Sequence, residues 1–166
     1  DMEAYLLHSQ IKSFSVAFIV ITLMMGILLR SLRLALFSMI PNFLPIFFGL
    51  ALMSAVDIPL DPGTVMIGAI ALGLVVDDTV HFLVRFRRYM TQGQELETAI
   101  ALSVREAGRP IIITSVVLAV SFSVMVLANF TPNINFGLVT GWVILLAVLA
   151  DLVILPTALR LFKVKF

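Results

Sequence analysis

The sequence has no cysteine and few charged residues, and each shortage excludes a class of protein. The 166 residues include 0 Cys, which excludes a disulfide framework and a thiolate metal site. Charged residues make up 13% of the chain and hydrophobic residues 61%. A soluble globule of this size needs far more polar surface than that. The composition therefore predicts a membrane protein.

The chain also lacks the marks of a leader, a repeat or a linker. No basic leader with a small-residue cleavage site precedes the first apolar segment, so we predict no signal peptide. No short-period repeat or low-complexity linker divides the chain, which favours one bundle. Because residue 1 is Asp rather than Met, we interpret the chain as a fragment of a longer protein.

Five apolar segments are each long enough to cross a bilayer as a helix, which takes about 17–25 residues. They lie at about residues 13–29, 34–56, 63–84, 110–130 and 134–159. Pro41 and Pro45 in the second segment are tolerable in a membrane helix as a packed kink. Residues 57–63 and 131–133 are rich in turn formers and predict tight connections. We therefore predict an all-α polytopic membrane protein with five transmembrane helices.

A sixth, amphipathic helix is expected at about residues 94–107. Leu96, Ile100 and Val104 repeat every four residues and form one apolar stripe, as in a helix that lies on a membrane surface. Gly108 and Pro110 are expected to mark its end and the start of the fourth span.

The basic residues predict the orientation of the bundle. With five alternating spans, ten basic residues fall on one side and only Lys12 on the other. The ten are Arg30, Arg33, Arg85, Arg87, Arg88, Arg105, Arg109, Arg160, Lys163 and Lys165. The positive-inside rule places these ten in the cytoplasm, the N-terminus outside and the C-terminus inside. We expect a multi-pass protein of a bacterial or archaeal plasma membrane, with an earlier helix before the first span.

The third span contains three ionisable residues, Asp77, Asp78 and His81. A carboxylate in the hydrocarbon core costs from about 2.5 to more than about 10 kcal/mol, so such residues are functional candidates. Ala69, Gly73, Asp77 and His81 follow one another at intervals of four and share a helix face. Asp78 is turned by about 100 degrees from Asp77. We expect the three ionisable groups to converge on one neighbour.

The last span offers that neighbour. Asp77 lies eight residues from Arg85 and Asp151 nine residues from Arg160, which places both carboxylates roughly 12–13 Å from the basic boundary at about 1.5 Å per residue. Asp151 continues a stripe through Thr140, Ile144 and Ala147, and a G-x-x-x-G at 137–141 favours close helix packing.

Thr114 and Ser115 of the fourth span add hydroxyl groups at a similar depth. Adjacent carboxylates in low dielectric cannot both ionise cheaply, so the Asp77 and Asp78 pair titrates as a unit, which suits reversible proton binding. Other interpretations stay open for the rest. Thr114 and Ser115 fit helix packing or bonding to their own backbone, Asp151 fits a structural hydrogen bond or ion pair, and His81 fits a side chain that leans toward the interface.

Several stretches together resemble one known family over essentially the whole chain. They are Gly73 to Leu83 with Arg85-Phe86-Arg87, Ala107 to Ile111 with Thr114-Ser115, Phe136-Gly137 through Ala150-Asp151-Leu152 to Leu155-Pro156, and the prolines at 41, 45 and 59 with their neighbours. They resemble the resistance-nodulation-division (RND) superfamily, and within it the MMPL-like exporters related to the sterol-sensing domain.

The resemblance implies spans two to six of one six-helix repeat. It implies that Asp77 and Asp78 are proton-relay residues, that the proton is the coupling ion, and that a second repeat of the parent chain completes the site. His81 is then an assisting group, with Asp151, Thr114 and Ser115 as neighbours. The implied preceding helix and large extracytoplasmic domain are not in the 166 residues.

We therefore predict the membrane domain of a proton-driven exporter of hydrophobic or lipid-like substrates, with no enzyme activity, cofactor, metal or nucleic-acid partner. A homo-oligomer stays open. The alternative is a sterol- or lipid-sensing module without transport. An intramembrane aspartyl protease is disfavoured because Val75 occupies the second glycine position of its Gly-x-Gly-Asp motif. A channel is disfavoured because no charged ring or filter-like sequence is present.

Overall fold

The computed structural model describes residues 2–59 and 62–162, and its secondary structure is helical throughout. The order is α1 (Met2–Leu29), α2 (Leu32–Ala55), α3 (Pro62–Thr91), α4 (Leu96–Ser123), η1 (Val124–Leu127), α5 (Thr131–Leu149), η2 (Ala150–Ile154) and α6 (Leu155–Leu161). Five helical stretches are long and apolar enough to cross a membrane. The predicted all-α class is confirmed. Residues 60–61 of the predicted turn, and the basic residues Lys163 and Lys165, lie outside the described residues.

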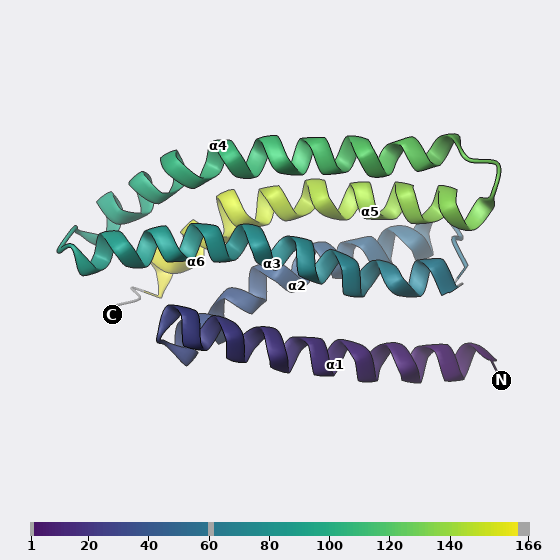
Figure 1. The fold of residues 1–166 in the computed structure, drawn as a ribbon, viewed down its shortest axis with the longest axis horizontal. Helices are drawn as coiled ribbons and strands as arrows, with labels where there is room; N and C mark the ends of the chain where they lie inside the picture. Colours follow the sequence, from purple (N-terminus) through teal and green to yellow (C-terminus); the bar gives the residue numbers. More distant parts are fainter. Residues whose placement is uncertain (1, 60–61, 163–166) are drawn as a thin grey trace.

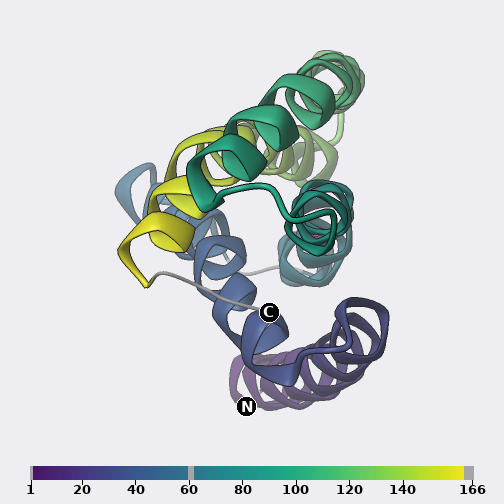
Figure 2. The same cartoon turned by 90° about the vertical axis from the view of Figure 1, so that its left-hand side faces the viewer.

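The long helices run back and forth along one axis. Figure 1 shows the α1–α2 and α3–α4 connections at the end where the C-terminus lies, and the α2–α3 and α4–α5 connections at the other end. The basic residues at 30–33 and 85–88 therefore share one end of the bundle, as the predicted alternation requires. The end-on view in Figure 2 shows α3 at an edge, with α1 and α4 on either side of it.

Apolar side chains occupy both the interior and the outer surface of the bundle. Phe82, Phe86 and Leu72 of α3 are fully buried in the core. Large apolar side chains such as Ile27, Phe47 and Leu127 are exposed on the outside. An exposed apolar surface of this extent requires an apolar surrounding, and a lipid bilayer provides it.

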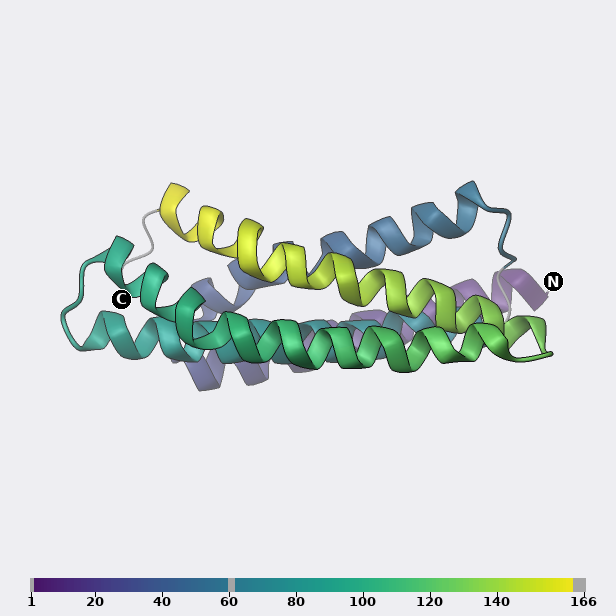
Figure 3. The ribbon, with the colours of Figure 1, turned by 90° about the horizontal axis from the view of Figure 1, so that it is seen from above.

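The predicted surface helix and fourth span are one helix rather than two. α4 runs from Leu96 to Ser123 through Gly108 and Pro110 without a break, and Figure 3 shows its first part turned away from the axis of the rest. Proline inside a helix removes one backbone hydrogen bond and bends the helix without having to end it. The expected boundary at Gly108 and Pro110 was therefore wrong.

The turn expected at residues 131–133 also lies elsewhere. The chain bends at 128–130, and α5 begins at Thr131 with Pro132 in its first turn. Proline suits that position because its fixed φ matches the helix and its missing N–H has no partner there in any helix. The sequence signal marked a helix start rather than the turn itself.

Gly137 of α5 allows a close approach to the end of α4. A Cβ at this position would overlap the carbonyl oxygen of Phe122 and would lie 2.8 Å from the Cβ of Met125. A Cβ at Gly141, one turn later, would lie 3.3 Å from Oγ of Ser123 and 3.4 Å from the carbonyl oxygen of Ala119, which is also a tight fit. The predicted G-x-x-x-G thus lies where α4 and α5 pack against each other.

Candidate functional site

The polar residues of α3 are divided between two sides of the helix. Ala69, Gly73, Asp77 and His81 are all exposed and form one face, as the spacing of four predicts. Asp78 is half-buried, and Thr79 is fully buried. Since successive residues on a helix are turned by about 100 degrees, three consecutive polar side chains point to three different neighbourhoods.

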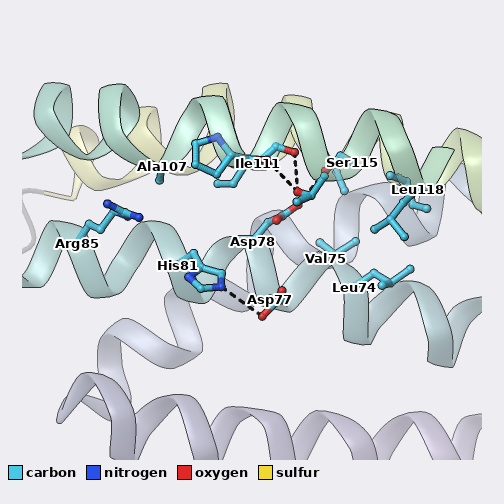
Figure 4. A pocket seen from close by; sticks show the side chains of 14 residues that line it. Leu74, Val75, Asp77, Asp78, His81, Arg85, Ala107, Ile111, Ser115 and Leu118 are labelled. Carbon is cyan, nitrogen blue, oxygen red and sulfur yellow. Dashed lines mark hydrogen bonds and ion pairs between the residues drawn. The ribbon is translucent and has the colours of Figure 1, made fainter. Parts of the chain in front are cut away.

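Asp77 and His81 form a pair on the exposed face. Nε2 of His81 lies 3.8 Å from Oδ1 of Asp77, and their side chains are 65% and 72% exposed. Figure 4 shows Asp77 pointing away from α4, on the opposite side of α3 from Asp78. The pair lies within one helix, so it leaves both groups available to a further partner.

Asp78 points instead toward α4. The hydroxyl of Ser115 donates a hydrogen bond to Oδ2 of Asp78 at 3.0 Å (Figure 4). The neighbouring Thr114 does not take part, because its hydroxyl donates to its own helix, at the carbonyl oxygens of Pro110 and Ile111. Of the two predicted hydroxyl neighbours, the structure brings only Ser115 to a carboxylate.

A cavity of about 210 Å³ lies between α3 and α4. Its polar lining includes Asp77, Asp78 and His81, with Arg85 nearer the basic end of the bundle. A single water needs only about 10–15 Å³ measured in this way, so the cavity has room for several. The carboxylates of both aspartates can therefore exchange protons with water in this space.

A polar cluster between α3 and α4 includes Arg85, which lines the cavity nearest the basic end of the bundle. Arg85 donates to Glu106 at 3.0 Å, and Tyr89 also donates to Glu106. Both ionic side chains are more than a third exposed, so solvent screens this ion pair and it adds little stability. The ion pair matters because it holds the Arg85 guanidinium at Glu106, so that Arg85 is not bound to Asp77 or Asp78.

A second, apolar groove of about 370 Å³ lies on the other side of α3, against α1. Methionine, leucine and isoleucine side chains of α1 form one wall, and Gly73, Val76 and Val80 of α3 form the other. Asp77 lines this groove as well as the cavity. Its carboxylate is therefore the one polar group that both spaces share.

Asp151 lies in a separate, buried position between η2, α2 and α3. It is 0% exposed, and its Oδ1 lies within hydrogen-bond distance of Oγ1 of Thr79, at 2.5 Å. Asn42 of α2 contacts the same Thr79 hydroxyl at 2.5 Å. Thr140, Ile144 and Ala147 are buried with Asp151, so the predicted stripe is the inward face of the last span.

Asp77, Asp78 and His81 line one cavity, but they do not share one bonding partner. Asp77 and His81 face outward, Asp78 faces Ser115, and Asp151 is bonded to Thr79. The spacing of residues fixes the direction in which each side chain leaves the helix. The packing of α4 and η2 decides which of these side chains meets a partner. Asp78 remains close enough to Asp151 for the two carboxylates to interact electrostatically.

Thr79 and Asn42 are the polar residues that sequence reasoning missed. Both are uncharged and lie in long apolar spans, where an amide or hydroxyl seeks a partner on another helix. The cost of leaving such a polar group unpaired in an apolar span was the signal that could have identified them. No cluster of three or more metal-binding side chains is present among the described residues.

Comparison with known proteins agrees with this architecture. A family model described as the MMPL family matches residues 1–163. A protein of Methanocaldococcus jannaschii that is named as a membrane protein is 28% identical over 155 residues, which are 93% of this chain. The chain spans 40% of the length of that relative.

Proposed function

Because the chain belongs to the MMPL family, we propose that it forms the membrane domain of a proton-driven RND-type exporter of hydrophobic or lipid-like substrates. Asp77 and Asp78 bind the proton, and His81 assists. One observation carries the proposal. Two adjacent carboxylates of an apolar helix open to a cavity large enough for water, and no described arginine or lysine is bound to either of them.

The chemistry of the cavity suits reversible protonation. A lysine or arginine partner would keep a carboxylate ionised, whereas the partners here are the hydroxyl of Ser115 and the imidazole of His81. A hydroxyl both donates and accepts hydrogen bonds, so it can serve Asp78 with and without its proton. One charge moved across the membrane potential releases about 2.3 kcal/mol per 100 mV, which is the energy available for export.

The apolar groove against α1 supports the substrate class. Its walls are aliphatic side chains, as an acyl chain or sterol requires, and Asp77 lies at its edge. A change in the charge of Asp77 therefore changes the polarity of the groove. In this proposal, the proton site and the substrate path lie on two sides of one carboxylate.

A transport measurement tests the proposal. The full-length protein, reconstituted in liposomes, is supplied with a fluorescent phospholipid, a fluorescent fatty acid or a fluorescent sterol, with and without an imposed proton gradient. We expect movement of at least one probe that requires the gradient and stops with a protonophore. Binding of these probes with no dependence on the gradient contradicts the proposal and favours a lipid-sensing module.

Ser115 and Thr114 provide a matched pair of variants for the hydrogen bond to Asp78. Ser115→Ala removes a hydrogen bond to a charged group, worth about 1.5–3 kcal/mol, and we expect gradient-driven transport to fall about tenfold. Thr114→Val removes a hydroxyl that serves only its own helix, and we expect transport within about twofold of wild type. Equal effects of the two substitutions would show that the contact of Ser115 with Asp78 is not used.

A further inference from the structure

Asp151 is the one ionisable side chain that is fully buried among the described residues. Its Oδ1 contacts Thr79, and its Oδ2 has no hydrogen-bond partner in the described part of the chain. An ionised carboxylate buried in this way, with one oxygen unpaired and no described arginine or lysine paired with it, is strongly unfavourable. A neutral carboxylic acid is far less costly in the same place.

The hydrogen bonds around Thr79 require a further hydrogen. Its Oγ1 lies 2.5 Å from Oδ1 of Asn42, 2.5 Å from Oδ1 of Asp151 and 3.3 Å from the carbonyl oxygen of Val75. A threonine hydroxyl carries only one hydrogen to donate. A second hydrogen comes either from a protonated Asp151 or from an Asn42 amide turned end for end.

Only protonation of Asp151 satisfies both requirements. Turning the amide of Asn42 pairs its NH₂ group, which otherwise lacks a partner, but it leaves a full negative charge on Asp151. A protonated Asp151 donates to Thr79, and Thr79 then donates to Asn42. An unpaired amide N–H costs less than an unbalanced buried charge, so the protonated arrangement is preferred.

The charged groups around Asp151 favour a proton as well. The elements that contact η2 most are α2, α3, α5 and α6, and Leu152 of η2 also lies next to Gly108 of α4. The described ionisable side chains of these helices are Arg33 on α2, Asp77, Asp78, His81, Arg85, Arg87, Arg88 and Tyr89 on α3, Glu97, Arg105, Glu106 and Arg109 on α4, and Arg160 on α6. Asp78 is close enough to act electrostatically on Asp151, and its like charge opposes a second negative charge beside it.

A metal cation does not fit between these oxygens. The oxygen atoms of Asp151 and Asn42 each lie 2.5 Å from the Thr79 oxygen, which is a hydrogen-bond distance between two oxygens. A cation needs about 2.0–2.6 Å from its own centre to each ligand oxygen, so the ligand oxygens around it must be farther apart than this. The cavity between α3 and α4 reaches Asp78 but is not lined by Asp151. The bound species is therefore a proton.

The backbone at Asp151 departs from a regular α-helix. The N–H of Leu155 donates to the carbonyl of Ala150, five residues earlier, so η2 is a π-helical turn. Pro156 follows directly and supplies no N–H of its own. Such turns often lie at functional positions, and this one carries Asp151 toward α2 and α3.

We propose that Asp151, Thr79 and Asn42 form a second, buried proton-binding site that joins η2 to α3 and α2. The proton on Asp151 completes the hydrogen bonds between these helices, and its loss places an unbalanced charge inside the packing. The site is distinct from the open site at Asp77 and Asp78. Its use in a transport cycle, by coupling protonation to helix separation, rests on the proposed function.

Infrared spectroscopy of the full-length protein in lipid at pH 7 tests the proposal, because a protonated carboxylic acid has its own carbonyl stretching band. The difference between wild type and Asp151→Asn is expected to contain one such band. Asp57→Asn is the control, since Asp57 is exposed on the turn after α2, and its difference spectrum is expected to contain none. No band in the Asp151→Asn difference overturns the proposal.

Two further variants keep the test decisive if Asp151→Asn does not fold. Thr79→Val removes the hydroxyl partner, and Asp78→Asn removes the neighbouring charge, so each is expected to shift the Asp151 band without removing it. A carboxyl spectrum that neither variant changes contradicts the proposal. A band that disappears when sodium ions are added shows a cation site instead. These spectra do not depend on transport, so failure of the buried site and failure of the exporter proposal are distinguishable.

Discussion

Asparagine in place of Asp78 is expected to abolish gradient-driven transport while leaving the protein folded. The side chain is half-buried, opens to the cavity between α3 and α4 and accepts its hydrogen bond from Ser115. An amide keeps the size and most hydrogen bonds of a carboxylic acid, but it cannot bind and release a proton. Transport in reconstituted liposomes is expected to fall to the level of protein-free vesicles.

Asp77→Asn is expected to have the same effect through the other carboxylate of the pair. Asp77 lines both the cavity and the apolar groove, so its charge is available to the proton and to the substrate. Asp57→Asn is the control for both variants, because Asp57 has a positive φ of 51 and asparagine tolerates that conformation. Full transport by both Asp77→Asn and Asp78→Asn would disprove the proton-relay role.

Gly137→Ala is expected to lower the free energy of unfolding by about 1–3 kcal/mol, the usual cost of overpacking. The added methyl group meets the backbone carbonyl of Phe122 as well as Met125. Backbone atoms of a packed helix cannot rotate away as a side chain can. α5 must therefore move away from α4, and thermal unfolding in detergent micelles measures the loss.

Gly73→Ala is the matched control for that substitution. No atom lies within 4 Å of a Cβ at Gly73, and alanine favours a helix over glycine by about 1 kcal/mol. Stability equal to or slightly above that of wild type is therefore expected. If both glycine variants lost the same stability, the close contact of α4 with α5 would not be the cause.

The membrane-spanning helices were predictable because their signal is local. Length, apolarity and flanking arginines are properties of each segment alone, so the spans from α1 to α5 were expected near their observed positions. Pro110 was misread because the same residue ends one helix and bends another. Which outcome occurs depends on whether neighbouring helices hold the two halves together, and the sequence alone does not show this.

The candidate site was predictable in part. The face that carries Asp77 and His81 followed from a spacing of four, and the cost of ionisable groups in an apolar span selected Asp77, Asp78 and Asp151. The partner of Asp78 required the position of α4, which brings Ser115 to the carboxylate and leaves Thr114 bonded to its own helix. Which of these two adjacent residues of α4 reaches Asp78 depends on how α4 is rotated about its own axis relative to α3.

The sequence by itself determined that the protein lies in a membrane, that it is helical, and that α3 carries its chemistry, because these conclusions need only composition and helix geometry. Only the tertiary structure separated an open carboxylate pair from a buried carboxylic acid. Asp78 and Asp151 are both costly in an apolar span, and the sequence placed Asp151 at a depth similar to that of Asp77, the neighbour of Asp78. The packing of α2, α3 and η2 closed water out from Asp151 and left Asp78 beside a cavity, since burial depends on neighbours from distant parts of the chain.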